Sequence, residues 1–236
     1  MNLGFMRYTT LLLDADETLL DFNKTEDQAL CETFRYFDLP FDDGIKNRYK
    51  ALNRELWAAF ERGTVTKPQL RAQRFRRLFA WMGVKNAPAG FEEEYQLALG
   101  RGAFLLPKAL EVCQNLSRCC RLYIVTNGVE ATQHSRLKAS GLSAFLDGVF
   151  VSEEAGFQKP QREYFDYVFS RIPDFDKVHT LIVGDSLHSD MQGGAAAGLD
   201  TCWYNPSGQD RETGIRICYE ISSLEELYGI VREISD

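Results

Sequence analysis

The chain has 236 residues, of which 44% are hydrophobic and 26% are charged. These proportions are ordinary for a globular protein, and the length suits one large α/β domain or a core domain with a smaller insert. The formal net charge is −7, which argues against a general polyanion-binding surface, so nucleic acid is not expected as a partner.

Two further classes of protein are also not expected. The uncharged apolar runs fall short of the roughly 20 residues that cross a bilayer, and the first six residues lack the pattern of a signal peptide. Six cysteines contain no CxxC pair, so they indicate neither a zinc site nor a disulfide framework, and the three histidines are dispersed in the sequence. We expect a cytoplasmic protein with reduced thiols and no membrane partner, of open oligomeric state.

The first predicted element is a strand over Tyr8–Leu13 that ends at two acids, Asp14 and Asp16. An apolar run of this kind suits a strand buried on both faces, and acids at its carboxyl end would lie where open α/β sheets bind ligands. Side chains two residues apart on a strand can point the same way, so their charges would repel. A cation, a shared proton or solvent must offset that repulsion.

Residues 23–102 are predicted to form helices without a strand. Apolar residues recur there at helical spacing, as in the sets Leu30, Phe34 and Phe37; Ile45, Tyr49, Leu52, Leu56 and Phe60; Leu70, Phe75, Leu78, Phe79 and Met82; and Phe91, Tyr95 and Ala98. Pro40 and Gly63 separate the first helices, and Thr66-Lys67-Pro68 begins the third.

From Leu105 onward, helices and strands are predicted to alternate. The expected strands cover Leu122–Val125, Gly148–Val151, Val178–Val183, Thr201–Tyr204 and Ile215–Tyr219. The expected helices cover Pro107–Leu116, Val129–Ser140, a segment opening at Pro160, Ser189–Ala197, and Ser223–Ile230 with its SLEE capping box. The fold class that follows is α/β, with a doubly wound, Rossmann-like parallel sheet built from residues 1–22 and 103–236 and an all-helical insertion at 23–102.

Four polar clusters follow apolar runs in this order: Asp14-Ala15-Asp16, Thr126-Asn127, Lys159-Pro160, and Gly184-Asp185-Ser186 with Asp190. Together they contain what phosphoryl transfer requires. Asp14 can attack as a carboxylate, and Asp16 can protonate the leaving oxygen and then activate water. Asp185 and Asp190 offer oxygen ligands suited to Mg²⁺. Thr126 offers a hydroxyl, the amides of Asn127 and Gly128 can bind an anion, and Lys159 supplies positive charge.

These clusters resemble, over nearly the whole chain, the four motifs of the haloacid dehalogenase (HAD) superfamily. The resemblance implies that Asp14 in DADET is the nucleophile and Asp16 the general acid/base, that Thr126 in VTNG and Lys159 hold the phosphoryl group, and that GDSLHSD binds the metal. It further implies Mg²⁺ coordination by Asp14, the backbone carbonyl of Asp16, Asp185 and a supporting Asp190. The inserted helices resemble the α-helical cap of that superfamily.

Glu17 and the segment ERGTVTKPQLRAQRF further resemble the bacterial 5′-nucleotidases that hydrolyse pyrimidine nucleoside monophosphates. A phosphate monoester of this class is therefore the expected partner. Trp57, Phe60 and Trp81 are candidates for stacking on a base, although aromatic residues at helical spacing are more often core residues. Seven basic residues between Arg62 and Lys85 are typical of a solvated helix face. In the alternative interpretation one or two of them reach a substrate, and Arg71 and Arg74, which flank the packed face of their helix, are better placed to do so than Arg76 and Arg77.

Three alternatives stay open at this point. A phospho-accepting receiver module also uses acids, a threonine and a lysine, but it does not need about eighty inserted helical residues or a second acid pair. A 2-haloacid dehalogenase would gain nothing from the carboxylate of Asp16. A phosphatase or phosphomutase for a sugar phosphate or another small phosphorylated metabolite has the same core motifs.

Overall fold

The computed structural model describes residues 6–85, 88–211 and 214–232, and the chain divides into two compact units. The first, here called the sheet unit, comprises residues 1–22 and 103–236, and the second, the helical unit, comprises residues 23–102. Each unit is described by itself below.

One parallel sheet forms the centre of the sheet unit, with the strand order β3-β2-β1-β4-β5-β6. Its strands are β1 (Thr10–Leu13), β2 (Arg121–Thr126), β3 (Gly148–Val151), β4 (Thr180–Gly184), β5 (Asp200–Tyr204) and β6 (Tyr219–Ile221). Leu11 of β1 pairs with Leu122 of β2 on one side and with Leu181 of β4 on the other. The strand that carries the first acids is therefore central, and the doubly wound parallel sheet predicted from the sequence is confirmed.

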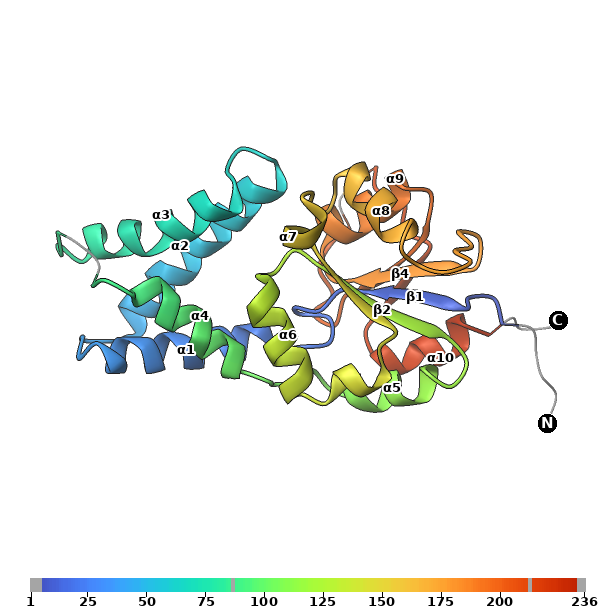
Figure 1. Ribbon diagram of the computed structural model, residues 1–236, viewed down its shortest axis with the longest axis horizontal. Coiled ribbons are helices and arrows are strands. Elements are labelled where there is room, and N and C mark those ends of the chain that lie inside the picture. Colours follow the sequence, from blue (N-terminus) through green and yellow to red (C-terminus); the bar gives the residue numbers. More distant parts are fainter. Residues whose placement is uncertain (1–5, 86–87, 212–213, 233–236) are drawn as a thin grey trace. The chain divides into compact units, whose positions relative to one another are not determined.

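Both faces of this sheet are buried, because successive side chains of a strand point to opposite faces. Leu11 and Leu13 belong to one core together with α5 (Ala109–Leu116) and α10 (Leu227–Ile230), whereas Leu12 belongs to another together with α8 (Arg162–Phe169). Figure 1 shows α5 and α10 on one face of the sheet and α8 and α9 on the other. This double burial explains why the strands appear in the sequence as nearly continuous apolar runs.

The connections between strands contain most of the helices of this unit. They are α5 (Ala109–Leu116), α6 (Glu130–Ala139), the 3-10 helix η1 (Leu142–Phe145), α7 (Ser152–Ala155), α8 (Arg162–Phe169), the π-helix η2 (Leu187–Gln192), α9 (Gly193–Ala196), the 3-10 helix η3 (Leu224–Glu226) and α10 (Leu227–Ile230). The predicted capping box at the start of the closing helix is present, with Ser223 and Glu226 as its two members.

Three predicted elements were wrong in detail. The helix expected to open at Pro160 begins at Arg162, because Gln158 and Gln161 first close a turn. The first residues of the helix expected over Ser189–Ala197 belong to the π-helix η2, which begins at Leu187 and is capped by the Ser186 side chain. The strand expected over Ile215–Tyr219 begins only at Tyr219. The preceding residues bond instead to Thr201, whose hydroxyl donates to Arg216 and accepts from the amide of Cys218.

The helical unit consists of α1 (Phe22–Tyr36), α2 (Asp43–Glu61), α3 (Lys67–Trp81) and α4 (Phe91–Arg101), of which Phe22 itself belongs to the sheet unit. Local signals begin two of them: the Asp42 side chain accepts from the amide of Ile45, and Thr66 forms a capping box with Gln69. Phe34, Phe75 and Phe91 pack edge to face, with Phe75 and Phe91 ring centroids 4.7 Å apart. The predicted apolar stripes thus form the interior of this unit.

A buried polar cluster crosses the same interior. Glu26 is only 5% exposed and accepts a 2.8 Å hydrogen bond from Nδ2 of Asn53. Burial raises the pKa of Glu26 to about 7, although the nearby Lys50 and the hydrogen bond from Asn53 act in the opposite direction. In the same interior, Arg74 lies over the ring of Tyr95, 4.7 Å from its centroid.

The raised pKa of Glu26 predicts how the stability of the helical unit depends on pH. Between the ordinary value of 4.5 and about 7, the folded state holds a proton that the unfolded state has released. This contribution to stability is fully present below pH 4.5 and is lost as the pH rises to about 7. Glu26→Gln, which keeps the acceptor for Asn53, should raise the free energy of unfolding at pH 8 by up to about 3 kcal/mol and much less at pH 5.

Urea denaturation followed by circular dichroism at the two pH values measures this difference. Glu55→Gln is the matched control, because the Glu55 side chain on α2 is 65% exposed. A gain in stability for Glu26→Gln that is the same at both pH values would contradict the assigned protonation.

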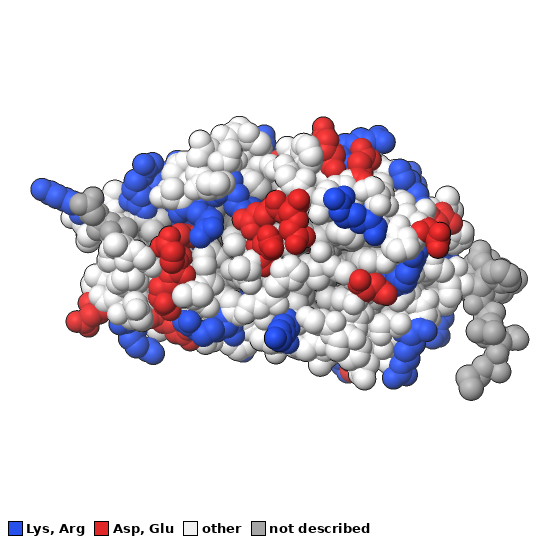
Figure 2. Space-filling view, viewed as in Figure 1, with Lys and Arg blue, Asp and Glu red and all other residues white. Residues whose placement is uncertain are grey.

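Two observations describe the helices and the surface of the molecule. Within the described residues, no helix is both long enough and apolar enough to span a bilayer. On the visible face of each unit, Lys and Arg are interspersed with Asp and Glu rather than gathered in one broad basic patch (Figure 2).

Candidate active site

The predicted acids meet at the carboxyl edge of the sheet. Asp14 follows β1 directly and Asp185 follows β4, and these strands are neighbours in parallel register. Asp190 lies in η2, just beyond β4. The carboxylate oxygens of these three residues lie within 4.8 Å of one another. Because parallel strands end at the same edge, residues far apart in the sequence come together here.

Lys159 links two of these acids. Its Nζ donates to Oδ1 of Asp14 and to Oδ1 of Asp190, each at 2.6 Å, and to the backbone carbonyl of Val125 at 2.7 Å. The Lys159 side chain is only 1% exposed, so these contacts are shielded from water. Burial alone would lower the pKa of Lys159, but the carboxylates of Asp14 and Asp190 raise it, so the ammonium stays charged.

The position of Asp190 depends on Gly184 and on the π-helix η2. A Cβ added at Gly184 would lie 2.2 Å from Oδ2 of Asp190, so only glycine lets this carboxylate approach the strand end. The amide of Ser186 donates to the same oxygen at 3.1 Å. In η2 the amides of Asp190 and Met191 both donate to the carbonyl of Ser186, and this wide turn places Asp190 beside Lys159.

The donor set fits a divalent cation. Asp14, Asp185 and Asp190 are three carboxylates with one ammonium among them, which leaves two negative charges if all are ionised. Burial raises the pKa of Asp14 to about 7, and burial followed by the charges of Asp14 and Asp190 raises the pKa of Asp185 well above its ordinary value. Within the described part of the chain, the carboxylate of Asp185 accepts only a long 3.4 Å hydrogen bond, from Thr18. Desolvated oxygens with this excess of charge suit Mg²⁺.

Asn127 holds the loop that carries Lys159, a role not predicted from the sequence. Its Nδ2 donates to the carbonyl of Lys159, and its Oδ1 accepts from the amide of Lys159, both at 2.9 Å. The amide of Gly128, expected to face an anion, donates instead to Oγ1 of Thr126 at 3.1 Å. Thr126 itself ends β2 and is buried. The TNG segment thus fixes the lysine loop and the threonine hydroxyl.

Asp16 lies next to this cluster, but its side chain makes different contacts. Its Oδ1 accepts from Arg136, and its Oδ2 accepts from Nε2 of Gln133 at 2.9 Å. Both partners are on α6, and each is only 1% exposed. Asp14 and Asp16 therefore do not share a cation through their side chains, and α6 offsets the charge of Asp16. Sequence reasoning missed both α6 residues.

Of the side chains of the helical unit that were considered for substrate binding, some are buried and others are exposed. Arg74, expected at the edge of the packed face, is 2% exposed and donates through Nε to Oε2 of Glu92 at 2.8 Å. The alternative in which Arg74 reaches past this edge to a substrate was wrong, because Glu92 on α4 supplies a carboxylate that draws the guanidinium inward. Arg71 donates to the same Glu92 but remains partly exposed. Phe60 is a core residue, whereas Trp81 is 52% exposed.

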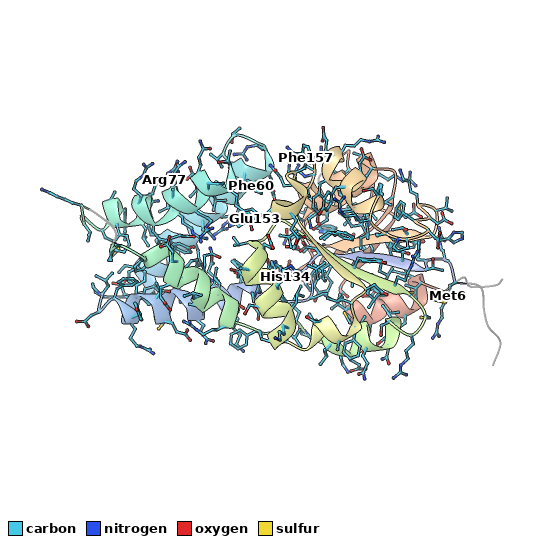
Figure 3. All side chains as sticks on the ribbon, viewed as in Figure 1. Met6, Phe60, Arg77, His134, Glu153 and Phe157 are labelled. Atoms are coloured by element: carbon cyan, nitrogen blue, oxygen red, sulfur yellow. The ribbon has the colours of Figure 1, made fainter. Side chains whose placement is uncertain are left out.

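A second group of potential metal ligands lies on the surface of the sheet unit. Glu130 and His134 on α6 and Glu154 on α7 have ligand atoms within 4.8 Å of one another, and all three are exposed. Figure 3 labels His134 and the neighbouring Glu153, which accepts a hydrogen bond from the amide of Glu130. Exposed acidic groups are common on protein surfaces, so we assign this group no function.

Comparison with known proteins identifies relatives of the whole chain. The family model for haloacid dehalogenase-like hydrolases matches residues 8–198. The HAD-hydrolase YfnB of Bacillus subtilis is 47% identical over 225 residues, covering 95% of this chain and 96% of YfnB. A crystal structure of YfnB bound to magnesium, described as revealing interdomain movement, superimposes with a TM-score of 0.91 and covers 95% of this chain and 99% of that one.

Two further relatives are named as pyrimidine 5′-nucleotidases. Pyrimidine 5′-nucleotidase PynA of Streptococcus pneumoniae is 36% identical over 223 residues, which is 94% of each chain. Pyrimidine 5′-nucleotidase YjjG of Escherichia coli is 32% identical over 222 residues, covering 94% of this chain and 97% of YjjG. These alignments include both the sheet unit and the helical unit.

Proposed function

The chain belongs to the haloacid dehalogenase-like hydrolases and is a phosphoric monoester hydrolase, and we propose that it is a 5′-nucleotidase for (deoxy)pyrimidine nucleoside monophosphates. The observation that carries the proposal is the buried contact of Lys159 with Asp14 beside Asp185 and Asp190. It supplies a carboxylate nucleophile, a fixed positive charge and oxygen ligands in one place. The nucleotide preference is supported by the printed activities of PynA and YjjG.

In the proposed reaction, a carboxylate oxygen of Asp14 attacks phosphorus while the bond from phosphorus to the ester oxygen breaks. The leaving oxygen takes a proton from Asp16, and an aspartyl-phosphate remains on Asp14. Asp16 then takes a proton from water as the water oxygen attacks the same phosphorus. The bond to Asp14 breaks, inorganic phosphate forms, and both acids return to their initial states.

Charge on the transferring phosphoryl group is stabilised by the remaining residues. Lys159 and the hydroxyl of Thr126 would contact phosphoryl oxygens, with Asn127 holding the lysine loop in place. Asp14, Asp185, Asp190 and the backbone carbonyl of Asp16 would hold Mg²⁺, which when bound neutralises part of the negative charge around the phosphate. We infer that the helical unit acts as a cap that selects the substrate, and the interdomain movement described for YfnB supports this inference.

A phosphate-release assay across nucleoside monophosphates, sugar phosphates and small phosphorylated acids, in the presence of Mg²⁺, tests the proposal. We expect the highest kcat/KM for UMP, CMP, dUMP and dTMP, with lower values for purine nucleotides. A higher kcat/KM for a sugar phosphate would overturn the nucleotidase assignment and leave the reaction class intact. Release from none of the esters by the folded protein would overturn the reaction mechanism as well.

A further inference from the structure

We propose that Gln133 and Arg136 on α6 form a positioning pair. In this pair Gln133 orients the hydroxyl of Thr126 towards the phosphoryl group, and both residues orient the carboxyl group of Asp16 towards the leaving ester oxygen. This inference rests on the proposed phosphatase reaction and adds two residues to it. Both side chains are 1% exposed, and both contact residues assigned to the reaction. Neither belongs to the four clusters that the sequence singled out.

The orientation of the Gln133 amide follows from its partners. Arg136 can only donate, and its Nη1 lies 2.9 Å from Oε1 of Gln133, so that atom must be the carbonyl oxygen. With Oε1 assigned in this way, the other end of the side chain is the amide nitrogen, and Nε2 donates to Oδ2 of Asp16 at 2.9 Å. The contact with Arg136 therefore determines which end of the Gln133 amide faces Asp16 and Thr126.

This orientation determines what the hydroxyl of Thr126 can do. The second hydrogen of Nε2 is directed to Oγ1 of Thr126 at 2.8 Å, and the amide of Gly128 donates to the same oxygen at 3.1 Å. These two bonds occupy both lone pairs of the hydroxyl oxygen, so its remaining capacity is to donate its own hydrogen. A phosphoryl oxygen is an acceptor, so Thr126 is prepared to bind it without reorientation.

The approach of Gln133 to this hydroxyl is possible because residue 128 is glycine. A Cβ at Gly128 would lie 2.5 Å from Nε2 of Gln133, a distance that no packed side chain tolerates. The tight fit shows that the amide occupies a space shaped for it, rather than a loose surface position.

Arg136 and Gln133 also fix the carboxyl group of Asp16. Arg136 donates to Oδ1 and Gln133 to Oδ2, so both oxygens are held and rotation about the last side-chain bond is restricted. The guanidinium of Arg136 lies over the ring of Phe22, 5.5 Å from its centroid, which places the arginine in turn. An acid that must deliver a proton to one ester oxygen benefits from such a fixed direction.

Substitution of Arg136 tests whether this residue orients the carboxyl group of Asp16. With Arg136→Met we expect kcat for nucleotides, which have poor leaving groups, to fall by roughly 10- to 100-fold, and kcat for an activated aryl phosphate to fall less than about threefold. Arg136→Lys, which can still donate to Asp16, should recover part of the loss. Asp16→Asn sets the upper limit of this leaving-group effect, and Lys138→Ala, an exposed change on the same helix, should match the wild type.

Gln133→Glu tests the orientation of Thr126 with a side chain of nearly the same size. A carboxylate oxygen opposite Oγ1 would take the hydroxyl hydrogen for itself, so kcat/KM should fall by about tenfold or more for both substrates. The inhibition constant of inorganic phosphate should rise in Gln133→Glu and stay unchanged in Arg136→Met. Melting temperatures monitor folding in every variant.

The possible outcomes separate this inference from the proposed function. An inactive but folded wild type would overturn both. An active wild type with equal losses for the two substrates in Arg136→Met, or with no loss in either variant, would overturn only the positioning pair. If Arg136→Met fails to fold, the comparison of Arg136→Lys with Gln133→Glu decides, because the pair requires a leaving-group effect in the first and a phosphate-binding effect in the second.

Discussion

Replacing Asp14 with Asn is expected to reduce phosphate release by roughly 10⁴-fold or more, the scale on which the loss of a nucleophile acts in covalent catalysis. An amide does not attack phosphorus at a useful rate, so an aspartyl-phosphate cannot form at this position. The change is almost isosteric, and Lys159 keeps its contacts with Asp190 and with the carbonyl of Val125. Loss of activity should therefore occur in a folded protein.

Thermal stability provides the second readout of this variant. Burial and the neighbouring carboxylates raise the pKa of Asp14 although Lys159 acts in the opposite direction, so the ionised group is unfavourable where it lies when no metal is bound. Without metal, Asp14→Asn should melt at or above the wild-type temperature. Asp166→Asn on α8, where the side chain is 57% exposed, is a matched control that should change neither property. A folded Asp14→Asn variant with wild-type turnover would exclude the covalent mechanism.

The part of the site that sequence reasoning predicted consists of residues at strand ends. Asp14, Thr126 and Asp185 each follow an apolar run, and parallel strands place such residues at one edge whatever their distance in the sequence. Lys159 was identified in another way, because it lies in a loop. It was recognised as a site residue only because its cluster stands third in the order of the four polar clusters. Its burial and its contacts with Asp14 and Asp190 could not be derived from local pattern.

The site residues that the sequence analysis did not predict lie on α6, a helix whose buried positions are mostly polar. Gln133, Arg136 and Leu137 are buried on α6, at positions where helical spacing would call for apolar residues. The sequence did contain one signal, which is the weak apolar stripe of this helix. A helix of this kind buries polar residues, and buried polar residues need hydrogen-bond partners. Which partners they have depends on tertiary contacts with Asp16 and Thr126, and periodicity carries no information about these.

Arg74 shows another limit of helical spacing as a guide to the site. Helical spacing placed it correctly at the edge of an apolar face, but spacing could not determine whether that edge met solvent or another helix. Glu92 on α4 provides a charge-assisted pair that brings Arg74 into the interior. The residues that would select a base in the proposed reaction therefore have to be sought among other side chains of the helical unit, and the exposed ring of Trp81 is one candidate for substitution.

Removal of divalent metal is the second change expected to have a large effect. Three carboxylates and one ammonium leave excess negative charge where an anionic substrate must bind, and burial together with that excess raises the pKa values of Asp14 and Asp185. Charge stabilisation by a bound metal is worth several kcal/mol, so exhaustive chelation should lower the rate by about 10³-fold or more. Added Mg²⁺ should restore the rate.

A measurement independent of activity tests the same site. Because Mg²⁺ would bind the folded chain and not the unfolded one, the melting temperature should rise with Mg²⁺ concentration, with a midpoint close to that for activation. Asp185→Asn removes one ligand oxygen charge and should shift both midpoints to higher Mg²⁺ concentration, whereas Glu154→Gln, in the exposed surface group, should shift neither. If the rate survives chelation, or if Asp185→Asn leaves the thermal response to Mg²⁺ unchanged, the carboxylate cluster does not bind the metal. Lys159 and Thr126 would then have to stabilise the phosphoryl charge alone.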